Sequence, residues 1–430
     1  MKRNPIVVVG TTPDYVARLH QTYPEPIFFV LDPRFKNHPL LGDVDQAILL
    51  YTPLDDFKGI LGSVQRYLSL NGLSLRGVAC FDCEYLIEAS RLAQHLKRPF
   101  PPPEAITRTR NKFTSRQIWR ETGLFTPQAI LAYGPLETLE FFRNLAKPIV
   151  LKPISGSGSE LIFLCESEEE VIGSVRIMEE QLPKRNLSPL FRPIRSTCRD
   201  NPINPCESWI VEEFVPGPEF SCDFILHDGH VLITRETGKV RAADQTFGSV
   251  LAYTTPPSYP ENFSIDSLPH LLGKASRSLG FTWGYFMVDF IIQNGRVVLI
   301  EMAPRPGGDS IPDLVEKAAG YDILGMYMDM MSGEYPPPKR IPMPSEPFAS
   351  INLFASEEGI ITRIDSSKIL SHPMVKALFL KKDVGDRVML PPNNYDDRLI
   401  GYCIVSPVPN WDPVLLYNQL QGLLKISLRV

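Results

Sequence analysis

Cysteine is scarce in this chain of 430 residues, and its seven cysteines are scattered and odd in number. A disulfide framework needs paired cysteines, so this pattern argues against a secreted, disulfide-stabilised protein and favours a cytoplasmic one. Cys80 and Cys83 have the spacing of a redox or metal pair, but no second pair follows that could complete a zinc site. A strand end with two buried thiols is the simpler interpretation.

Long apolar runs are also missing, since no segment approaches the length that crosses a membrane. The four-residue run Ile6–Val9 is too short for a secretory signal and instead predicts a first strand. The formal net charge of -5 gives no electrostatic reason to expect nucleic acid or an anionic membrane as a partner. No Gly-x-Gly-x-x-Gly motif follows the first strand, which argues against a dinucleotide site there.

The residues that are present have the composition of a large globular protein, with 43% apolar and 22% charged residues. Residues 1–105 alternate short apolar strands with stretches of helical periodicity, which predicts a parallel sheet with crossover helices. The strands are expected at Ile6–Val9, Ile27–Leu31, Ala47–Leu50 and Gly77–Cys80, and the helices at Asp56–Leu70 and Glu84–Leu96.

Proline clusters at Pro99–Pro103 and Tyr335–Pro338 mark two boundaries in the remainder of the chain. The predicted organisation is an N-terminal α/β domain at 1–105, a helical connection at 106–147, a strand–loop–helix subdomain at 148–215, a strand-rich core at 216–335 and a C-terminal module at 336–430. The basic, proline-rich segment 183–208 predicts a long loop that is either solvated and mobile or gates a substrate site.

The most informative segment is a predicted β-hairpin over residues 284–303, because two acids interrupt its apolar strands. Asp289 lies in the first strand, Glu301 lies in the second, and Arg305 follows four residues later. Buried carboxylates are costly unless they are paired or bind a metal ion. The hairpin therefore suggests a metal–phosphate site, with a salt-bridged structural hairpin as the alternative.

The turn of this hairpin decides which way the two acids face, because side chains alternate along a strand. We expect a three-residue loop, Gln293–Gly295, with its glycine in the left-handed region. This loop would place Asp289 opposite Leu299, with Glu301 as its diagonal neighbour on the same face.

Three further segments carry residues suited to a nucleotide. Lys112 begins a predicted helix capped by Asn111, and Lys152 ends an apolar strand before the Ser/Gly-rich loop 155–159. The backbone N–H groups of such a loop can fold over phosphates, although a plain turn between strands has the same composition. The apolar strand within 209–219 runs into acids, and its backbone could read an adenine edge; an edge strand with an acidic turn is the alternative.

In this order and spacing, the segments resemble the ATP-grasp superfamily of carboxylate–amine ligases from about residue 100 to 335. The region before them is similar to the domain that precedes the grasp in those enzymes. Residues 336–430 are similar to the small C-terminal module of the bacterial L-amino-acid (dipeptide) ligase branch. The resemblance implies an α/β and α+β multidomain protein, in which a Rossmann-like parallel-sheet domain precedes an ATP-grasp fold and a β-rich module follows it.

The resemblance also implies residue roles. Arg305 would stabilise the transferring phosphoryl group, and Lys152 would be the second catalytic residue. The residues that would hold ATP are Lys112, Lys152, Ser157, Gly158, Ser159, Glu212, Glu213, Val215 and Glu219. Asp289 and Glu301 would bind Mg²⁺, with Mn²⁺ as an alternative, and Gly307, Gly308 and Asp309 would shape the carboxylate pocket. Lys239 or Arg241 is either a further cation of the site or part of a solvated basic pair.

The implied reaction joins a carboxylate to an amine, both of them amino acids, through an acyl-phosphate, and yields ADP and phosphate. The alternatives are an ATP-grasp carboxylase or carboxylate kinase acting on another small acid or a nucleotide precursor, and a non-catalytic nucleotide-binding protein. The expected partners are small-molecule substrates, and a homodimer is an option because related enzymes are often dimers. Ala303 stands where many ATP-grasp enzymes have a metal-binding Asn, which leaves the number of metal ions open.

Overall fold

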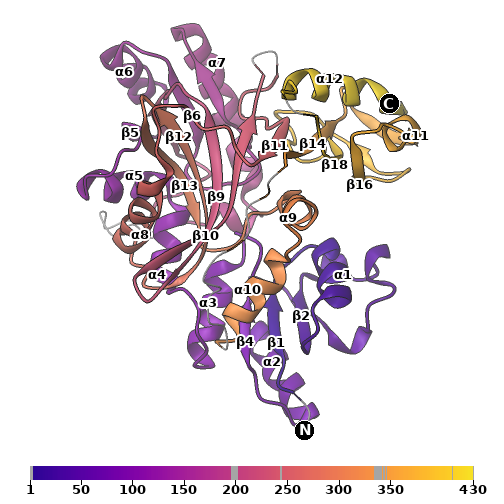
Figure 1. The fold of residues 1–430 in the computed structure, drawn as a ribbon. Coiled ribbons are helices and arrows are strands. Elements are labelled where there is room, and N and C mark those ends of the chain that lie inside the picture. Colours follow the sequence, from indigo (N-terminus) through magenta and orange to yellow (C-terminus); the bar gives the residue numbers. More distant parts are fainter. Residues whose placement is uncertain are drawn as a thin grey trace.

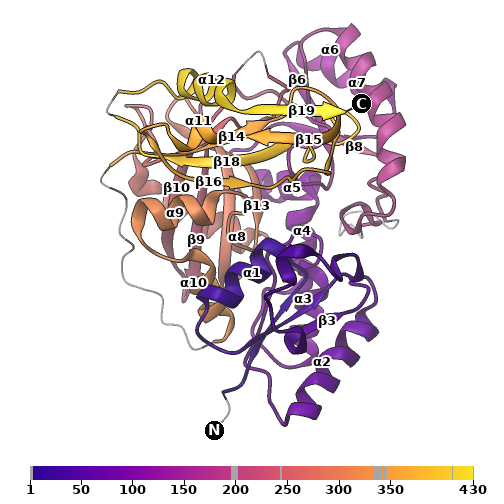
Figure 2. The same cartoon turned by 90° about the vertical axis from the view of Figure 1, so that its right-hand side faces the viewer.

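The computed structural model describes residues 3–194, 202–242, 245–333, 341, 344, 346–408 and 410–429. The N-terminal domain lies at one end of the molecule, and a long antiparallel sheet occupies the middle (Figures 1 and 2). The C-terminal module and helices α6 (Pro135–Leu145) and α7 (Glu168–Gln181) lie at the opposite end. The predicted boundary at 335–340 lies outside the described residues.

The N-terminal domain is a parallel sheet in the order β3-β2-β1-β4. Its strands are β1 (Ile6–Val9), β2 (Ile27–Leu31), β3 (Leu49–Tyr51) and β4 (Gly77–Ala79), and its helices are α1 (Pro13–Thr22), α2 (Phe57–Asn71) and α3 (Leu86–His95). Every residue of β1 and β2 is buried, because α2 and α3 cover one face while α1 and α10 (Ile323–Met331) cover the other. The predicted parallel sheet with crossover helices is confirmed.

The next segment begins with α4 (Pro103–Arg110) and α5 (Lys112–Glu121). Asn111 caps α5 as predicted, because its side chain accepts a hydrogen bond from the Thr114 N–H. A four-stranded antiparallel sheet follows in the order β5-β8-β6-β7. Its strands are β5 (Ala129–Ala132), β6 (Ile149–Pro153), β7 (Phe163–Cys165) and β8 (Trp209–Glu213), and α6 (Pro135–Leu145) and α7 (Glu168–Gln181) pack beside them. We call residues 129–213 the lid.

The predicted long loop at 183–208 contributes to the lid core where it is described. Leu190, Phe191 and Cys206 are buried and pack with the lid strands, which argues against a fully solvated segment. Arg195 and Arg199 of this loop lie outside the described residues.

The central sheet has eight strands in the order β13-β12-β9-β10-β11-β14-β18-β16. They are β9 (Glu219–His227), β10 (His230–Val240), β11 (Ala252–Thr255), β12 (Gly284–Gln293), β13 (Arg296–Ala303), β14 (Phe348–Phe354), β16 (Val375–Leu380) and β18 (Leu399–Val405). Helix α8 (Leu268–Ser278) contacts β10, and α9 (Ile311–Ala319) contacts β14 and β18. Because β11 pairs with β14, the C-terminal module shares this sheet with the core.

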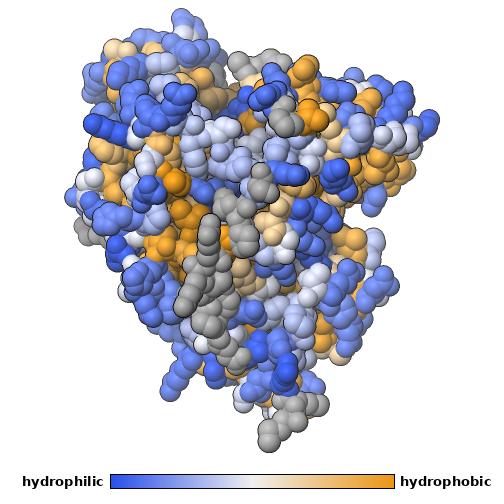
Figure 3. Space-filling view, viewed as in Figure 1, coloured by the Kyte–Doolittle hydropathy of each residue, from blue (hydrophilic) through white to orange (hydrophobic). Residues whose placement is uncertain are grey.

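The rest of the C-terminal module is a small antiparallel sheet in the order β17-β15-β19. Its strands are β15 (Gly359–Asp365), β17 (Arg387–Val388) and β19 (Lys425–Arg429), and its helices are α11 (Ser367–Leu370) and α12 (Pro413–Leu423). Figure 3 shows that the face seen in Figure 1 is largely polar, with apolar side chains gathered near β10 and near β16. Among the described residues, no helix is long and apolar enough to cross a membrane.

The hairpin β12–β13 does not have the predicted three-residue loop. Gln293 pairs with Arg296, so the turn is the two-residue Asn294-Gly295. Both turn residues have positive φ, 51° and 74°, which is the requirement of a type I′ turn and the reason that Asn-Gly favours it. The prediction of the loop was therefore wrong.

The register of the two acids was also wrong in detail, although their common face is correct. Phe290, and not Asp289, lies opposite Leu299. The register then shifts between Asp289 and Phe290, because Ile300 is an extra residue on β13, and Asp289 lies directly opposite Glu301. A β-bulge therefore restores the shared face that a regular two-residue hairpin would have destroyed.

Candidate functional site

The two acids of the hairpin face lysines from other elements of the fold. The Asp289 carboxylate lies 2.5 Å from the Lys239 Nζ at the end of β10, and the Glu301 carboxylate lies 3.2 Å from the Lys112 Nζ at the start of α5. Lys239 also lies 2.9 Å from Glu219, the first residue of β9. The structure thus brings together Lys112, Glu219, Asp289 and Glu301, which the sequence analysis had assigned to one site.

Lys239 is a buried member of this cluster, which excludes the alternative of a solvated basic pair for this residue. Its side chain is 8% exposed. Burial lowers the pKa of Lys239, but the charges of Asp289 and Glu219 outweigh burial and raise it above its usual value. Burial raises the pKa of Asp289, but the charge of Lys239 outweighs burial and lowers that pKa below its usual value. Both groups are therefore charged at neutral pH.

The donor set at the hairpin fits a hard divalent cation that shares its coordination with a phosphate. The Asp289 Oδ1 atom is buried and has no hydrogen-bond partner among the described residues, so this oxygen is available to a cation. The described residues contain no group of three or more His, Cys, Asp or Glu side chains that could hold a metal ion by themselves. Asp289 and Glu301 would supply only part of an oxygen shell, and the shell of Mg²⁺ is usually completed by water and substrate phosphates.

A second cluster of charges lies in the lid, where Glu212 is held between two cations. The Glu212 carboxylate lies 2.6 Å from the Lys152 Nζ and 2.8 Å from the Arg116 Nε, and all three side chains are buried. Burial raises the pKa of Glu212, but the charges of Arg116 and Lys152 outweigh it and lower the pKa below its usual value. Burial lowers the pKa of Lys152, and the charge of Glu212 offsets only part of that change.

The predicted phosphate loop lies beside the Lys112 side chain, whose Nζ donates a hydrogen bond of 3.3 Å to the Gly156 carbonyl. Ser157 and Gly158 are exposed at the tip of the loop. Gly158 and Ser159 both have positive φ, 64° and 58°. Such consecutive left-handed residues turn backbone N–H groups in one direction, which suits an anion.

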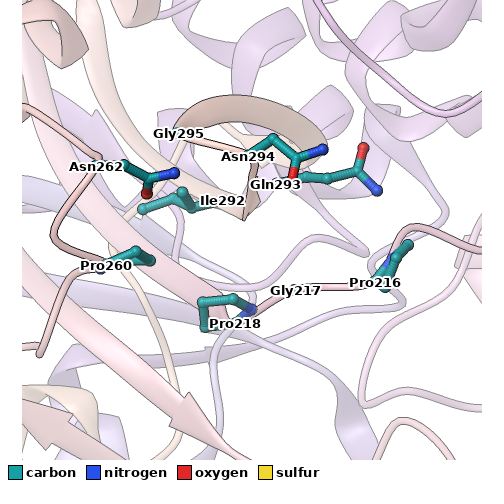
Figure 4. A pocket seen from close by; sticks show the side chains of 9 residues that line it. All are labelled: Pro216, Gly217, Pro218, Pro260, Asn262, Ile292, Gln293, Asn294 and Gly295. Carbon is teal, nitrogen blue, oxygen red and sulfur yellow. The ribbon is translucent and has the colours of Figure 1, made fainter.

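The predicted adenine-reading segment follows β8. The Glu213 side chain accepts a hydrogen bond from the Gln128 N–H, and Val215 is buried just after the strand end. Next along the chain, an open groove of about 400 Å³ lies between residues 216–218, Pro260, Asn262 and the hairpin turn 292–295 (Figure 4). This groove contains none of the predicted site residues, so the adenine-reading role stays a prediction.

The Arg305 side chain, which follows β13, contacts the N-terminal domain. Its Nε donates to the Cys83 Sγ at 3.0 Å, and its Nη1 donates to the Pro306 carbonyl at 2.7 Å. These described contacts involve neither Asp289 nor Glu301. Cys83 follows β4, which neighbours β1 at the point where connections from a parallel sheet diverge, and small molecules commonly bind at such edges. Arg305 therefore lies between the central sheet and this edge.

Gly307, two residues after Arg305, is held by a buried ion pair. The Gly307 N–H donates to the Asp223 carboxylate at 3.0 Å, and Asp223 pairs with Arg235 at 2.5 Å. A side chain at Gly307 would collide with that pair, because an added Cβ would lie 2.9 Å from the Arg235 Nη2. Asp309 is exposed and lies 3.7 Å from the Lys381 Nζ of the C-terminal module.

Sequence reasoning missed Arg116, Asp223 and Arg235. Arg116 could have been found, because it lies four residues after Lys112 and therefore on the same face of α5. Asp223 and Arg235 lie opposite each other in the hairpin β9–β10, and its Asp228-Gly229 turn is a signal that the sequence offers. The register shift between Ile233 and Arg235, which sets the two residues opposite each other, has no such local signal.

Asp82, next to Cys83, should make stability depend on pH. Burial, followed by the charge of Glu84, raises the pKa of Asp82 to about 7. The folded state thus holds this proton more tightly than the unfolded state, so the free energy of unfolding should fall as the pH rises from about 4 to about 7. Asp82→Asn should be more stable than the parent protein at about pH 8 and equal to it at about pH 4. Urea unfolding at both pH values tests this, and an equal difference at the two would contradict it.

Comparisons with known proteins bear on the family and the fold. Residues 145–313 match the ATP-grasp domain family. The chain is 22% identical to the uncharacterized protein y4rH of Sinorhizobium fredii, over 74% of this chain and 61% of that protein. It is 24% identical to the dapdiamide A synthase of Enterobacter agglomerans, over 50% of this chain and 46% of that enzyme. These matches thus span less than two thirds of either relative.

The fold has a solved counterpart. The crystal structure of an L-amino acid ligase from Bacillus licheniformis superposes with a TM-score of 0.75, covering 100% of both chains at 17% identity. Identity at this level shows a common fold. The chain therefore contains an ATP-grasp domain, has the fold of the ATP-grasp enzymes, and resembles the carboxylate–amine ligases among them.

Proposed function

We propose that this protein is an ATP-dependent ligase that joins the carboxylate of one amino acid to the amino group of another, with ADP and phosphate as the other products. The observation that carries the proposal is the convergence of Asp289 and Glu301 on one face of the hairpin, beside Lys112 and Lys239. Two acids and two lysines around one point suit a metal-bound triphosphate better than they suit a purely structural hairpin.

In this proposal, the cations neutralise the charge of ATP. Lys112 and Lys152 bind its phosphates, and the backbone of Ser157, Gly158 and Ser159 covers them. Glu212 fixes Lys152 in position through their buried ion pair. The backbone of Glu213 and Val215 takes the adenine edge, and Glu219 takes the ribose. Asp289 and Glu301 would hold Mg²⁺, which would neutralise the phosphate oxygens around the transferring group.

The substrate carboxylate would lie near Arg305 and the glycines that follow it. A carboxylate is a poor electrophile, and phosphorylation converts it into an acyl-phosphate that an amine can attack. The Arg305 guanidinium would stabilise the charge of the transferring phosphoryl group, with Gly307, Gly308 and Asp309 forming the wall of the pocket. The lid would exclude water, because water would hydrolyse the acyl-phosphate before the amine reacted.

A screen for ADP release tests this function. The protein is incubated with ATP and pairs of amino acids, with and without Mg²⁺, and the amide product is measured by mass spectrometry. We expect ADP and amide in equal amounts with at least one pair, and neither without the metal ion. ADP formed only with other small acids would favour the carboxylase or carboxylate kinase alternative. Nucleotide binding without ADP formation across the panel would contradict an enzymatic role.

A further inference from the structure

A loop of the C-terminal module is built into the core of the lid. Residues 391–398 lie in the connection between β17 and β18, and within this loop Tyr395 is 6% exposed. Its ring packs in the apolar cluster that includes Phe191 and Trp209. The other buried members of this cluster among the described residues all lie between 132 and 211, so Tyr395 is the buried contribution from outside the lid.

Polar contacts hold the same loop to the lid. The Arg185 Nη2 donates a hydrogen bond of 3.2 Å to the Pro392 carbonyl. The same guanidinium is kept in place within the lid, since its Nε lies 2.6 Å from Glu160 and its Nη1 donates to the Gln181 carbonyl at 2.9 Å. Arg185 is therefore fixed within the lid and donates a hydrogen bond to the backbone of the loop.

The loop also touches the predicted phosphate loop itself. A Cβ added to Gly158 would lie 2.6 Å from the Asp396 Oδ1, so this carboxylate lies directly against the glycine. In addition, Arg398 donates to the Ser249 Oγ at 2.7 Å, and a Cβ added to neighbouring Gly248 would lie 3.1 Å from the Ser159 Cβ. Two residues of the phosphate loop, Gly158 and Ser159, thus lie against groups outside the lid.

We propose that residues 391–398 are a latch that positions the lid, and with it the phosphate loop, over the bound nucleotide, with Tyr395 as its central positioning residue. Tyr395 anchors the latch by filling a place in the lid core, and Arg185 and Asp396 fix the register between latch and lid. The effect of the latch on the reaction rests on the proposed ligase function, whereas the docking of the latch against the lid does not.

Hydrogen exchange tests the docking without any substrate. In the nucleotide-free protein, Tyr395→Ala should make the backbone amides of residues 156–160 exchange at least fivefold faster, as followed by mass spectrometry. Tyr395→Phe keeps the ring and should restore slow exchange. Leu420→Ala is the control, because Leu420 is 0% exposed in the core of the C-terminal module and its truncation loosens that module without removing a member of the lid cluster.

A glycine substitution gives a second, independent measurement. Gly158→Ala adds a methyl group against Asp396 and should speed lid exchange, and Asp396→Ala in the same chain should reverse part of that effect. The rescue controls for backbone strain, because an alanine at the φ of 64° of Gly158 is strained whether or not Asp396 is present. Faster exchange in Gly158→Ala with no rescue by Asp396→Ala would count against the latch.

The coupling of ATP use to product tests the role of the latch in the reaction. In Tyr395→Ala, we expect at least two ADP molecules per amide, because water reaches the acyl-phosphate under a loosened lid. Unchanged exchange in Tyr395→Ala would overturn the latch whatever the enzyme does. Faster exchange in a protein that forms no ADP with any substrate would keep the latch and overturn the proposed ligase function instead.

Discussion

Replacing Arg305 by Ala should lower the rate of ADP formation on the order of 10³-fold while leaving the protein folded. The guanidinium is the group proposed to stabilise the transferring phosphoryl charge, and positioned charge is the main contribution that proteins make to phosphoryl transfer. The cost to stability should be small, because the described hydrogen bonds of Arg305 are to a thiol and to the carbonyl of the next residue. Single-turnover ADP formation and a thermal unfolding curve measure the two effects.

The matched control for Arg305→Ala is Arg34→Ala. Arg34 also lies near the carboxyl end of the N-terminal sheet, but it stacks over Phe35 and not against the glycines of the predicted pocket. Arg305→Lys keeps the charge and loses the planar geometry, so it should fall between the parent protein and the alanine variant. Unchanged turnover in Arg305→Ala would remove this residue from the mechanism and, with it, the proposed position of the substrate carboxylate.

Replacing Glu212 by Ala should destabilise the fold by about 3–5 kcal/mol, because it leaves two buried cations without a partner. Lys152 and Arg116 are 5% and 1% exposed, so solvent cannot replace the lost carboxylate. The pKa of Glu212 is lowered in the folded state. Its contribution to the free energy of unfolding is therefore present above the usual pKa of a glutamic acid and is lost as the pH falls through the folded pKa. Urea unfolding near neutral pH measures the loss.

A triple variant tests whether the stability depends on the three charges themselves or only on each buried charge having a partner. Replacing Glu212 by Leu together with Arg116→Met and Lys152→Met removes all three charges, and burial of apolar side chains should recover most of the stability. The triple variant should nevertheless bind ATP weakly, because Lys152 is a proposed phosphate ligand. Glu179→Ala, an exposed position on α7, is the control and should change stability by less than about 0.5 kcal/mol. A loss in Glu212→Ala no larger than in this control would contradict the buried triad.

Local signals predicted many of the elements. β1 and β2 begin and end at the residues that the sequence indicates, and the ends of α2 and α3 lie within two residues of the predicted ones. Short apolar runs and helical periodicity mark these elements without reference to the rest of the chain. Asn111 was found as a helix cap for the same reason, since its partner is only three residues away. The ATP-grasp fold could be inferred because its motifs keep their order along the chain.

The tertiary structure decided how the site is assembled. The Asn-Gly turn of the hairpin was readable, but the bulge at Ile300 that returns Glu301 to the face of Asp289 depends on pairing between the whole strands. Lys239 comes 50 residues before Asp289, and Cys83 comes 222 residues before Arg305. Such contacts arise from packing between distant segments, where burial selects which charges must meet.

The sequence by itself therefore determined the elements, the order of the motifs and the kinds of side chain available for phosphate chemistry, because these follow from local pattern. Only the tertiary structure decided that Arg116 joins Glu212, that Lys239 lies between two acids and that Tyr395 enters the lid core. The physical reason is that the partner of a buried charge or ring is chosen by three-dimensional packing, which no window of neighbouring residues contains.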